Sequence, residues 1–283
     1  MKIIKARAIK SVLVVMCVLT SWSVHAASVV GSRHDLSSTN PNLNFVKVTG
    51  DGGTGFDTTQ TCVFCHTPHG SQSRDNVDAP LWNRGITTAT YQPYQSPTLD
   101  SGTGGIAPAP DGVSLACLSC HDGTVALDLL VNKPGVGGWI DPTDPTLGGN
   151  NNRIGFVFNR TGVNNTFPTT DENGDPNVRL LGTDLRDDHP VSLVYPTIAN
   201  TDPKFNAPTA TRGSGNAQLD WFDDGDSILE DNEVRLYGTK VQCASCHNPH
   251  GTAVDNTPDG VPYPSFLRTT VANSSLCTVC HIK

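Results

Sequence analysis

Four copies of the pattern Cys-x-x-Cys-His are the residues in this chain best suited to chemistry. We number them motifs 1 to 4 in chain order. Their thiols are Cys62 and Cys65, Cys117 and Cys120, Cys243 and Cys246, and Cys277 and Cys280. The histidines that follow directly are His66, His121, His247 and His281. This spacing is the attachment signature of c-type haem, in which both thiols bond to the porphyrin and the adjacent His binds the iron. The sequence therefore predicts four covalently attached haem c groups.

The second ligand of each iron is predicted to be histidine as well. The chain has two Met, at positions 1 and 16, and both precede residue 27. Four further histidines follow that point, namely His34, His69, His189 and His250. Four irons and four additional histidines favour bis-His ligation throughout, with the alternative that some are hydrogen-bonded surface residues. A bis-His iron has no open position for a substrate, so we expect an electron carrier and not an enzyme.

Motifs 1 and 3 are extended in the same way, as Cys-His-x-Pro-His-Gly ending at Gly70 and Gly251. His69 follows His66 by three residues on the same local turn, so it cannot easily reach the opposite face of the same haem. We therefore expect His69 and His250 each to bind the iron of a different haem, which would hold two haems close together. The alternative is that they hydrogen-bond a haem propionate.

The two remaining histidines have distinct surroundings. His189 follows two aspartates and precedes Pro190, which biases it to an extended backbone. Asp187 or Asp188 could accept the other ring N–H and fix its tautomer. His34 lies close to the expected mature N-terminus. It could fold back on the first haem or reach a haem of the next subunit, and a head-to-tail contact of that kind builds a filament.

Residues 1–26 read as a secretory signal peptide. Lys2, Lys5, Arg7 and Lys10 precede an apolar run over 11–20, and Ala26 ends a small-residue cleavage site. We predict an exported protein, extracellular or at the cell surface, alternatively periplasmic, with no membrane span. Removing these four positive charges from a formal net charge of -8 leaves about -12, which makes nucleic acid an improbable partner.

The predicted fold class is a multihaem cytochrome c, mostly coil with short helices around the haem motifs and a core formed largely by haems. The chain contains 27 Gly and 20 Pro, and 92–114 and 132–152 are predicted loops. After the signal, 27–131 would carry haems 1 and 2, and 241–283 would carry haems 3 and 4. The 132–240 interval is predicted to be a small β-containing insert that supplies His189. Within it, strands are expected at 153–159, 191–195 and 233–237, whereas 115–130 is the best helix candidate.

An acidic run over 220–233 partly matches a Ca²⁺ loop of the Asp-x-Asp-x-Asp-Gly type. The candidate ligands are Asp220, Asp224, Asp226 and Asp231, although Phe222 occupies the second liganding position. The alternative is a solvated acidic turn without a metal.

Several of these segments together resemble the exported multihaem c-type cytochromes of metal-reducing microbes. They are 34–37, Cys62–Gly70, Pro80–Arg84, Cys117–Thr124, Asp188–Val191 and Cys243–Gly251. The haem count and extended motifs are similar to the OmcE-like tetrahaem type that polymerises into extracellular filaments. The resemblance implies a continuous haem stack, a homopolymer in which His34 binds a haem of the neighbouring subunit, and redox partner cytochromes with extracellular electron acceptors. The alternatives are a monomeric tetrahaem shuttle and a multihaem oxyanion reductase, which would need an open iron.

Overall fold

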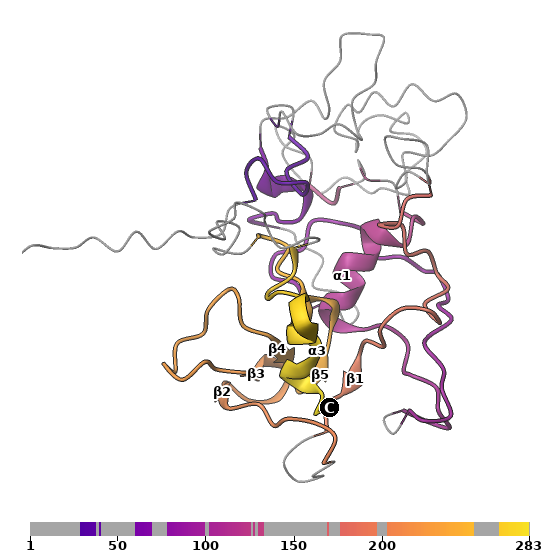
Figure 1. Cartoon of the computed structure of the whole chain (residues 1–283). Helices are drawn as coiled ribbons and strands as arrows, with labels where there is room; N and C mark the ends of the chain where they lie inside the picture. Colours follow the sequence, from indigo (N-terminus) through magenta and orange to yellow (C-terminus); the bar gives the residue numbers. More distant parts are fainter. Residues whose placement is uncertain are drawn as a thin grey trace, which may run out of the picture.

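The computed structural model describes residues 29–37, 40, 60–69, 78–99, 102–125, 127, 130–132, 169, 176–196, 203–251 and 266–282. The signal segment, the predicted strand at 153–159 and most of the predicted loop at 132–152 lie outside these residues. Within them, every helix and strand is short and most of the chain is coil and turn (Figure 1).

A five-stranded antiparallel sheet forms in the order β1-β5-β4-β3-β2. The strands are β1 (Leu193–Val194), β2 (Ala210–Arg212), β3 (Leu219–Trp221), β4 (Arg235–Tyr237) and β5 (Lys240–Val241). A 3-10 turn, η4 (Gly215–Ala217), connects β2 to β3. The predicted strands at 191–195 and 233–237 correspond to β1 and β4. Gly238 and Thr239 form the two-residue turn of the β4–β5 hairpin, and both have positive φ. Two-residue turns of this kind match the right-handed twist of the strands they connect.

The longest helix is α1 (Gly112–His121), and it carries motif 2. It begins inside the segment predicted as loop and ends well before residue 130. Gly123 lies at φ 71°, a left-handed conformation that ends helices and that glycine adopts without strain. The sequence pattern was therefore wrong about both ends of this helix.

The other three motifs occupy single helical turns. Motif 1 begins with η1 (Cys62–Phe64), motif 3 forms α2 (Cys243–Cys246), and motif 4 ends α3 (Ser275–Cys280), which follows η7 (Ala272–Ser274). The short α2 packs against both α1 and β4. This packing joins the sheet to the motif-bearing part of the chain.

Polar side chains fill much of the interior. Arg84 and Asn83 are among the largest fully buried side chains, together with Phe64 and Leu118. Arg84 donates to the carbonyls of Leu127 and Ser119, at 2.7 and 3.1 Å. Such residues tie loops to one another where aliphatic packing is sparse. No helix in the described part of the chain is long and apolar enough to cross a membrane.

Candidate haem-binding sites

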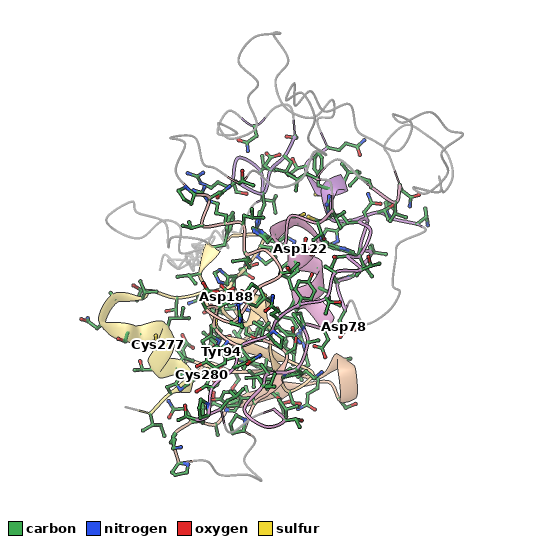
Figure 2. All side chains as sticks on the ribbon, turned by 90° about the vertical axis from the view of Figure 1, so that its right-hand side faces the viewer. Asp78, Tyr94, Asp122, Asp188, Cys277 and Cys280 are labelled. Carbon is green, nitrogen blue, oxygen red and sulfur yellow. The ribbon has the colours of Figure 1, made fainter. Side chains whose placement is uncertain are left out.

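Each motif presents its two thiols and its imidazole from one turn of backbone. In motifs 1, 3 and 4 the N–H of the histidine donates to the carbonyl of the first cysteine. These bonds run from His66 to Cys62 at 2.8 Å, from His247 to Cys243 at 3.1 Å and from His281 to Cys277 at 2.9 Å. Motif 2 makes the same turn inside α1. Figure 2 shows Cys277 and Cys280 on α3. One turn of this kind suits attachment along a single ring edge.

A short antiparallel clamp fixes the histidine of motif 1. The N–H of Thr67 donates to the Leu81 carbonyl at 2.8 Å, and the N–H of Asn83 donates to the Cys65 carbonyl at 2.9 Å. His66 lies opposite Trp82 between these two bonds. The peptides on both sides of His66 are therefore held, which restricts the direction of its side chain.

Motifs 3 and 4 use the same clamp, built from unrelated segments. Each has one bond to the carbonyl of the second cysteine and one from the residue after the histidine, all at 2.8 Å. For motif 3 these are Arg268 to Cys246 and Asn248 to Phe266, and for motif 4 they are Asn206 to Cys280 and Ile282 to Lys204. In motif 2 the His121 carbonyl instead accepts from Leu181 and Gly182. The clamping segments of motifs 1 and 4 share the pattern Pro-x-aromatic-Asn, at 80–83 and 203–206. The side chain of each Asn also donates to carbonyls inside its motif, from Asn83 to Val63 and from Asn206 to Thr278 and Val279. This repeated pattern is a signal that the sequence analysis missed.

Three pairs of imidazoles lie close together, each joining one motif histidine to one additional histidine. The pairs are His66 with His250 at 6.1 Å, His34 with His121 at 6.2 Å and His189 with His281 at 6.5 Å between ring centroids. A metal–imidazole bond is about 2 Å long and a ring nitrogen lies about 1 Å from its centroid, so two imidazoles across one metal hold their centroids about 6 Å apart. The three spacings suit bis-His ligation of an iron between each pair.

Ring orientation in these pairs also suits ligation. Four Nδ1 atoms contact backbone carbonyls, namely His66 with Pro80 and His121 with Arg179 at 2.7 Å, and His34 with Pro249 and His189 with Pro190 at 3.0 Å. A carbonyl only accepts, so Nδ1 carries the proton and Nε2 keeps the lone pair that binds a metal. For His189 the contact is with the carbonyl of the next residue, Pro190, and not with the predicted Asp187 or Asp188.

His34 is paired within its own chain. Its ring stacks on Phe266, with centroids 4.3 Å apart and planes at 4°, and lies beside His121 of motif 2. Burial is the main cause that lowers the pKa of His34 to about 4, against the opposing hydrogen bond to Pro249, and the charge of His121 lowers it further. His34 is therefore neutral at neutral pH, as an iron ligand must be.

Of the two additional histidines in the extended motifs, His250 of motif 3 lies beside motif 1, whereas His69 of motif 1 has no corresponding described contact with motif 3. His250 lies beside His66 of motif 1 and thus next to a motif other than its own, while its binding to an iron there stays a prediction. His69 is exposed and belongs to none of the three pairs described above. It is the one additional histidine that the described contacts do not place opposite a motif histidine.

The thiols of successive motifs are neighbours. The Cys117 thiol hydrogen-bonds Cys243. This bond, together with burial, raises the pKa of Cys117 well above its usual value, whereas the same bond lowers the pKa of Cys243 against the opposing effect of burial. Burial raises the pKa of Cys65 to about 12, with a smaller effect of Cys120. Burial likewise raises the pKa of Cys246 to about 11. The Cys65 and Cys246 thiols therefore stay protonated at neutral pH, which is the opposite of an activated catalytic cysteine.

A buried polar network sets the contact between motifs 2 and 3. Gln242 is 3% exposed, donates from Nε2 to Asp111 at 2.8 Å and accepts from the Ser114 hydroxyl. The N–H of Cys243 donates to the same hydroxyl at 3.0 Å, and Lys240 pairs with Asp111. The first cysteines of the two motifs are thus held side by side.

One buried donor indicates that a non-protein acceptor belongs near motif 1. The Trp82 side chain is buried and lies edge-on to His66, with centroids 6.4 Å apart. Its Nε1 is buried and finds no acceptor among the residues that the structure describes. A buried N–H without a partner is costly. A propionate or another acceptor on a bound haem would satisfy it, so the residues present fit this group.

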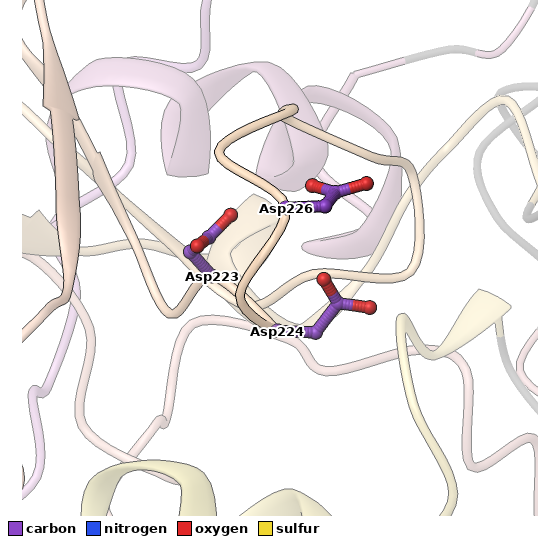
Figure 3. A group of neighbouring side chains, drawn as sticks. All are labelled: Asp223, Asp224 and Asp226. Carbon is purple, nitrogen blue, oxygen red and sulfur yellow. The ribbon is translucent and has the colours of Figure 1, made fainter.

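The acidic loop differs from the predicted Ca²⁺ ligand set. The carboxylates that gather are Asp223, Asp224 and Asp226, with oxygens within 4.8 Å of one another (Figure 3). Asp220 lies in β3, and its carboxylate accepts from Gln218 Nε2 instead. Asp231 is outside the group as well. Because the N–H groups of Gly225 and Ser227 donate to Asp223 at 3.1 and 2.9 Å, this is a hydrogen-bonded acidic turn.

Comparison with family models and with curated proteins gives no match for this chain.

Proposed function

We propose that this protein is an exported tetrahaem c-type cytochrome that carries electrons through closely spaced bis-His haems. The observation that supports it best is the set of three imidazole pairs, each between a motif histidine and an additional histidine, with centroids 6.1–6.5 Å apart. A bound haem supplies one-electron redox chemistry at its iron. The resemblance to exported multihaem cytochromes is consistent with this function.

The residues of the chain then have defined roles. The eight motif cysteines hold the porphyrin edges, and His66, His121, His247 and His281 bind the irons from one side. His250, His34 and His189 bind the irons of motifs 1, 2 and 4 from the other side, and we assign His69 to the iron of motif 3. The backbone clamps and the Gln242 network hold successive sites in contact, which keeps electron-transfer distances short.

Haem stoichiometry and spin state test this proposal. Mass spectrometry of the chain, exported with a cytochrome c maturation system, is expected to show four covalent haems, and its ferric spectrum should be entirely low-spin. A chain that matures with fewer than four haems would refute the tetrahaem assignment. Binding of CO to the native reduced protein would reveal an open iron and favour the oxyanion reductase instead.

We further propose that the cytochrome polymerises into an electron-conducting extracellular filament, with the monomeric shuttle as the alternative. Because His34 already lies opposite His121 in one chain, a bond from His34 to another subunit would require that pair to open. His69, which is exposed on the extended motif 1, is the better-placed residue for such a bond, and the motif 3 iron assigned to it would then belong to the neighbouring subunit. Electron microscopy of sheared cell-surface material separates the two, since discrete particles alone would exclude the filament.

A further inference from the structure

Two buried arginines lie beside motif 3 and share one stretch of backbone. Arg268 is 3% exposed and Arg235 is 9% exposed. Arg268 Nη1 donates to the Asp231 carbonyl at 2.7 Å, and Arg235 Nη2 donates to the Glu230 carbonyl. Because these carbonyls belong to consecutive residues, the two guanidinium groups are close neighbours. Burial, followed by the charge of Arg268, lowers the pKa of Arg235 to about 10.

Arg268 is built into the turn of motif 3. Its N–H donates to the Cys246 carbonyl at 2.8 Å, and its Nε donates to the Ala244 carbonyl at 2.9 Å. Its guanidinium therefore lies against the peptides that carry both attachment thiols of this motif. Its charge also acts on the Cys246 thiol and on His250.

Neither charge is neutralised by direct contact with a carboxylate in the described part of the chain. Arg268 donates to two carbonyls and, at 3.4 Å, to the Tyr237 hydroxyl, whereas Arg235 donates to carbonyls alone. The nearby Glu233 carboxylate accepts from the N–H groups of Asp224 and Glu230 instead. A buried charge without an ion-pair partner is costly. The charge of Asp231 acts on both arginines and that of Glu233 acts on Arg235, but only through space and without an ion-pair contact. The pair therefore places two buried positive charges directly beside motif 3, with the compensating carboxylates farther away.

This positive potential has a direct consequence for an iron attached at motif 3. Ferrous haem carries one positive charge less than ferric haem, so a buried cation close by disfavours the ferric form and raises the reduction potential. The effect is larger in a buried site than at the surface because water screens it less. Arg84, a single buried arginine, donates to Ser119 of motif 2 and its charge acts on Cys65 and His121. Among the described residues, motifs 1 and 2 therefore share one buried positive charge, whereas motif 3 lies beside two.

We propose that Arg235 and Arg268 tune the haem of motif 3 to the highest reduction potential of the four. This inference rests on the proposed tetrahaem function. The motif 3 haem is then the first to accept an electron and the last to release one.

Spectroelectrochemical titration of the holoprotein tests the proposal. Arg268→Gln and Arg235→Gln are expected to move the highest of the four one-electron components to lower potential and to leave the other three in place. Arg268→Lys keeps the charge and should shift the component much less. Arg212→Gln removes an exposed arginine of β2 and should shift none. A His247→Met background, which changes only the motif 3 iron, identifies the component that belongs to this motif.

The outcomes separate this inference from the proposed function. A wild-type chain without four haems refutes the function before any variant is made. Four haems with no shift, with equal shifts of all components, or with the same shift in Arg268→Lys, refute the tuning role alone. Should Arg268→Gln lose haem, Arg235→Gln still tests the charge, because Arg235 makes no hydrogen bond to motif 3.

Discussion

Replacing His34 by Ala is the sharpest test of the ligand assignment. In the structure the ring centroids of His34 and His121 lie 6.2 Å apart in the same chain. Under the proposed assignment, the substitution would therefore remove one ligand from the iron of motif 2. One iron of four, or about a quarter of the total, should become high-spin while the others stay low-spin. The variant also loses the hydrogen bond to Pro249, about 1 kcal/mol, and the stacking on Phe266, about 1 kcal/mol.

Electron paramagnetic resonance of the ferric holoprotein measures the high-spin fraction directly. The high-spin fraction should not change when the protein is diluted, since in the proposed assignment His34 and His121 belong to one chain. His34→Met is the matched control, because Met also binds haem iron and should keep the spectrum low-spin while raising the potential of a single haem. An Ala variant with four low-spin irons would refute the pairing. A high-spin fraction that varies with the concentration of the wild-type protein would show that the ligand comes from a neighbouring subunit.

Three further predictions follow from described contacts. Asn83, fully buried, donates to Val63 at 2.6 Å and Asn132 at 3.0 Å and accepts from the Asn132 N–H at 2.8 Å. Asn83→Leu should therefore lower the free energy of unfolding by about 3 kcal/mol in urea titrations of the holoprotein, and a loss below about 1 kcal/mol would contradict this. Burial lowers the pKa of His34 to about 4 and also depresses the pKa values of His121 and His250. Their contribution to stability is present above the unfolded-state pKa of about 6.5 and is lost as pH falls toward 4, so a thermal midpoint that stays constant over this range would disprove it. Finally, millimolar Ca²⁺ should leave the thermal midpoint unchanged in both wild type and Asp224→Asn, and a calcium-dependent rise seen only in wild type would establish a metal site at the acidic turn.

The sequence predicts haem attachment at the motifs, which stays a prediction, whereas the neighbours of the histidines could not be predicted from it. Cys-x-x-Cys-His specifies a haem and one ligand within five residues, because the turn that carries them is local. Which additional histidine faces which motif depends on how distant segments pack. The sequence left open whether His34 would serve the first haem or another subunit, and the structure places it beside motif 2. The spacing between His247 and His250 did indicate that His250 would lie near a motif other than its own, because that inference depends only on the local turn.

Local signals had the same limits in the rest of the fold. Gly123 interrupts the predicted helix, but its left-handed conformation, which ends α1, depends on the packing that follows it. The acidic run was located correctly, yet Asp220 was assigned to the cluster although it belongs to β3. Asp220 pairs with Leu236 in the sheet, and this pairing directs the Asp220 carboxylate to Gln218 and away from Asp224 and Asp226. The clamping segments 80–83 and 203–206 share a Pro-x-aromatic-Asn pattern, but the pattern alone does not say which motif each segment pairs with, because that depends on how distant parts of the chain pack.

The three imidazole pairs also determine how the mature chain responds to a protease. The intervals that they close, 34–121, 66–250 and 189–281, overlap in succession without a gap between residues 34 and 281. With a haem in each pair, a cut anywhere in this span leaves two pieces that at least one histidine–iron–histidine bridge still joins. Nicked protein should therefore keep its mass in native gels and separate into fragments only when acid or denaturant releases the imidazoles. With the proposed haems bound, cleavage of a surface loop would then leave the haem sites joined.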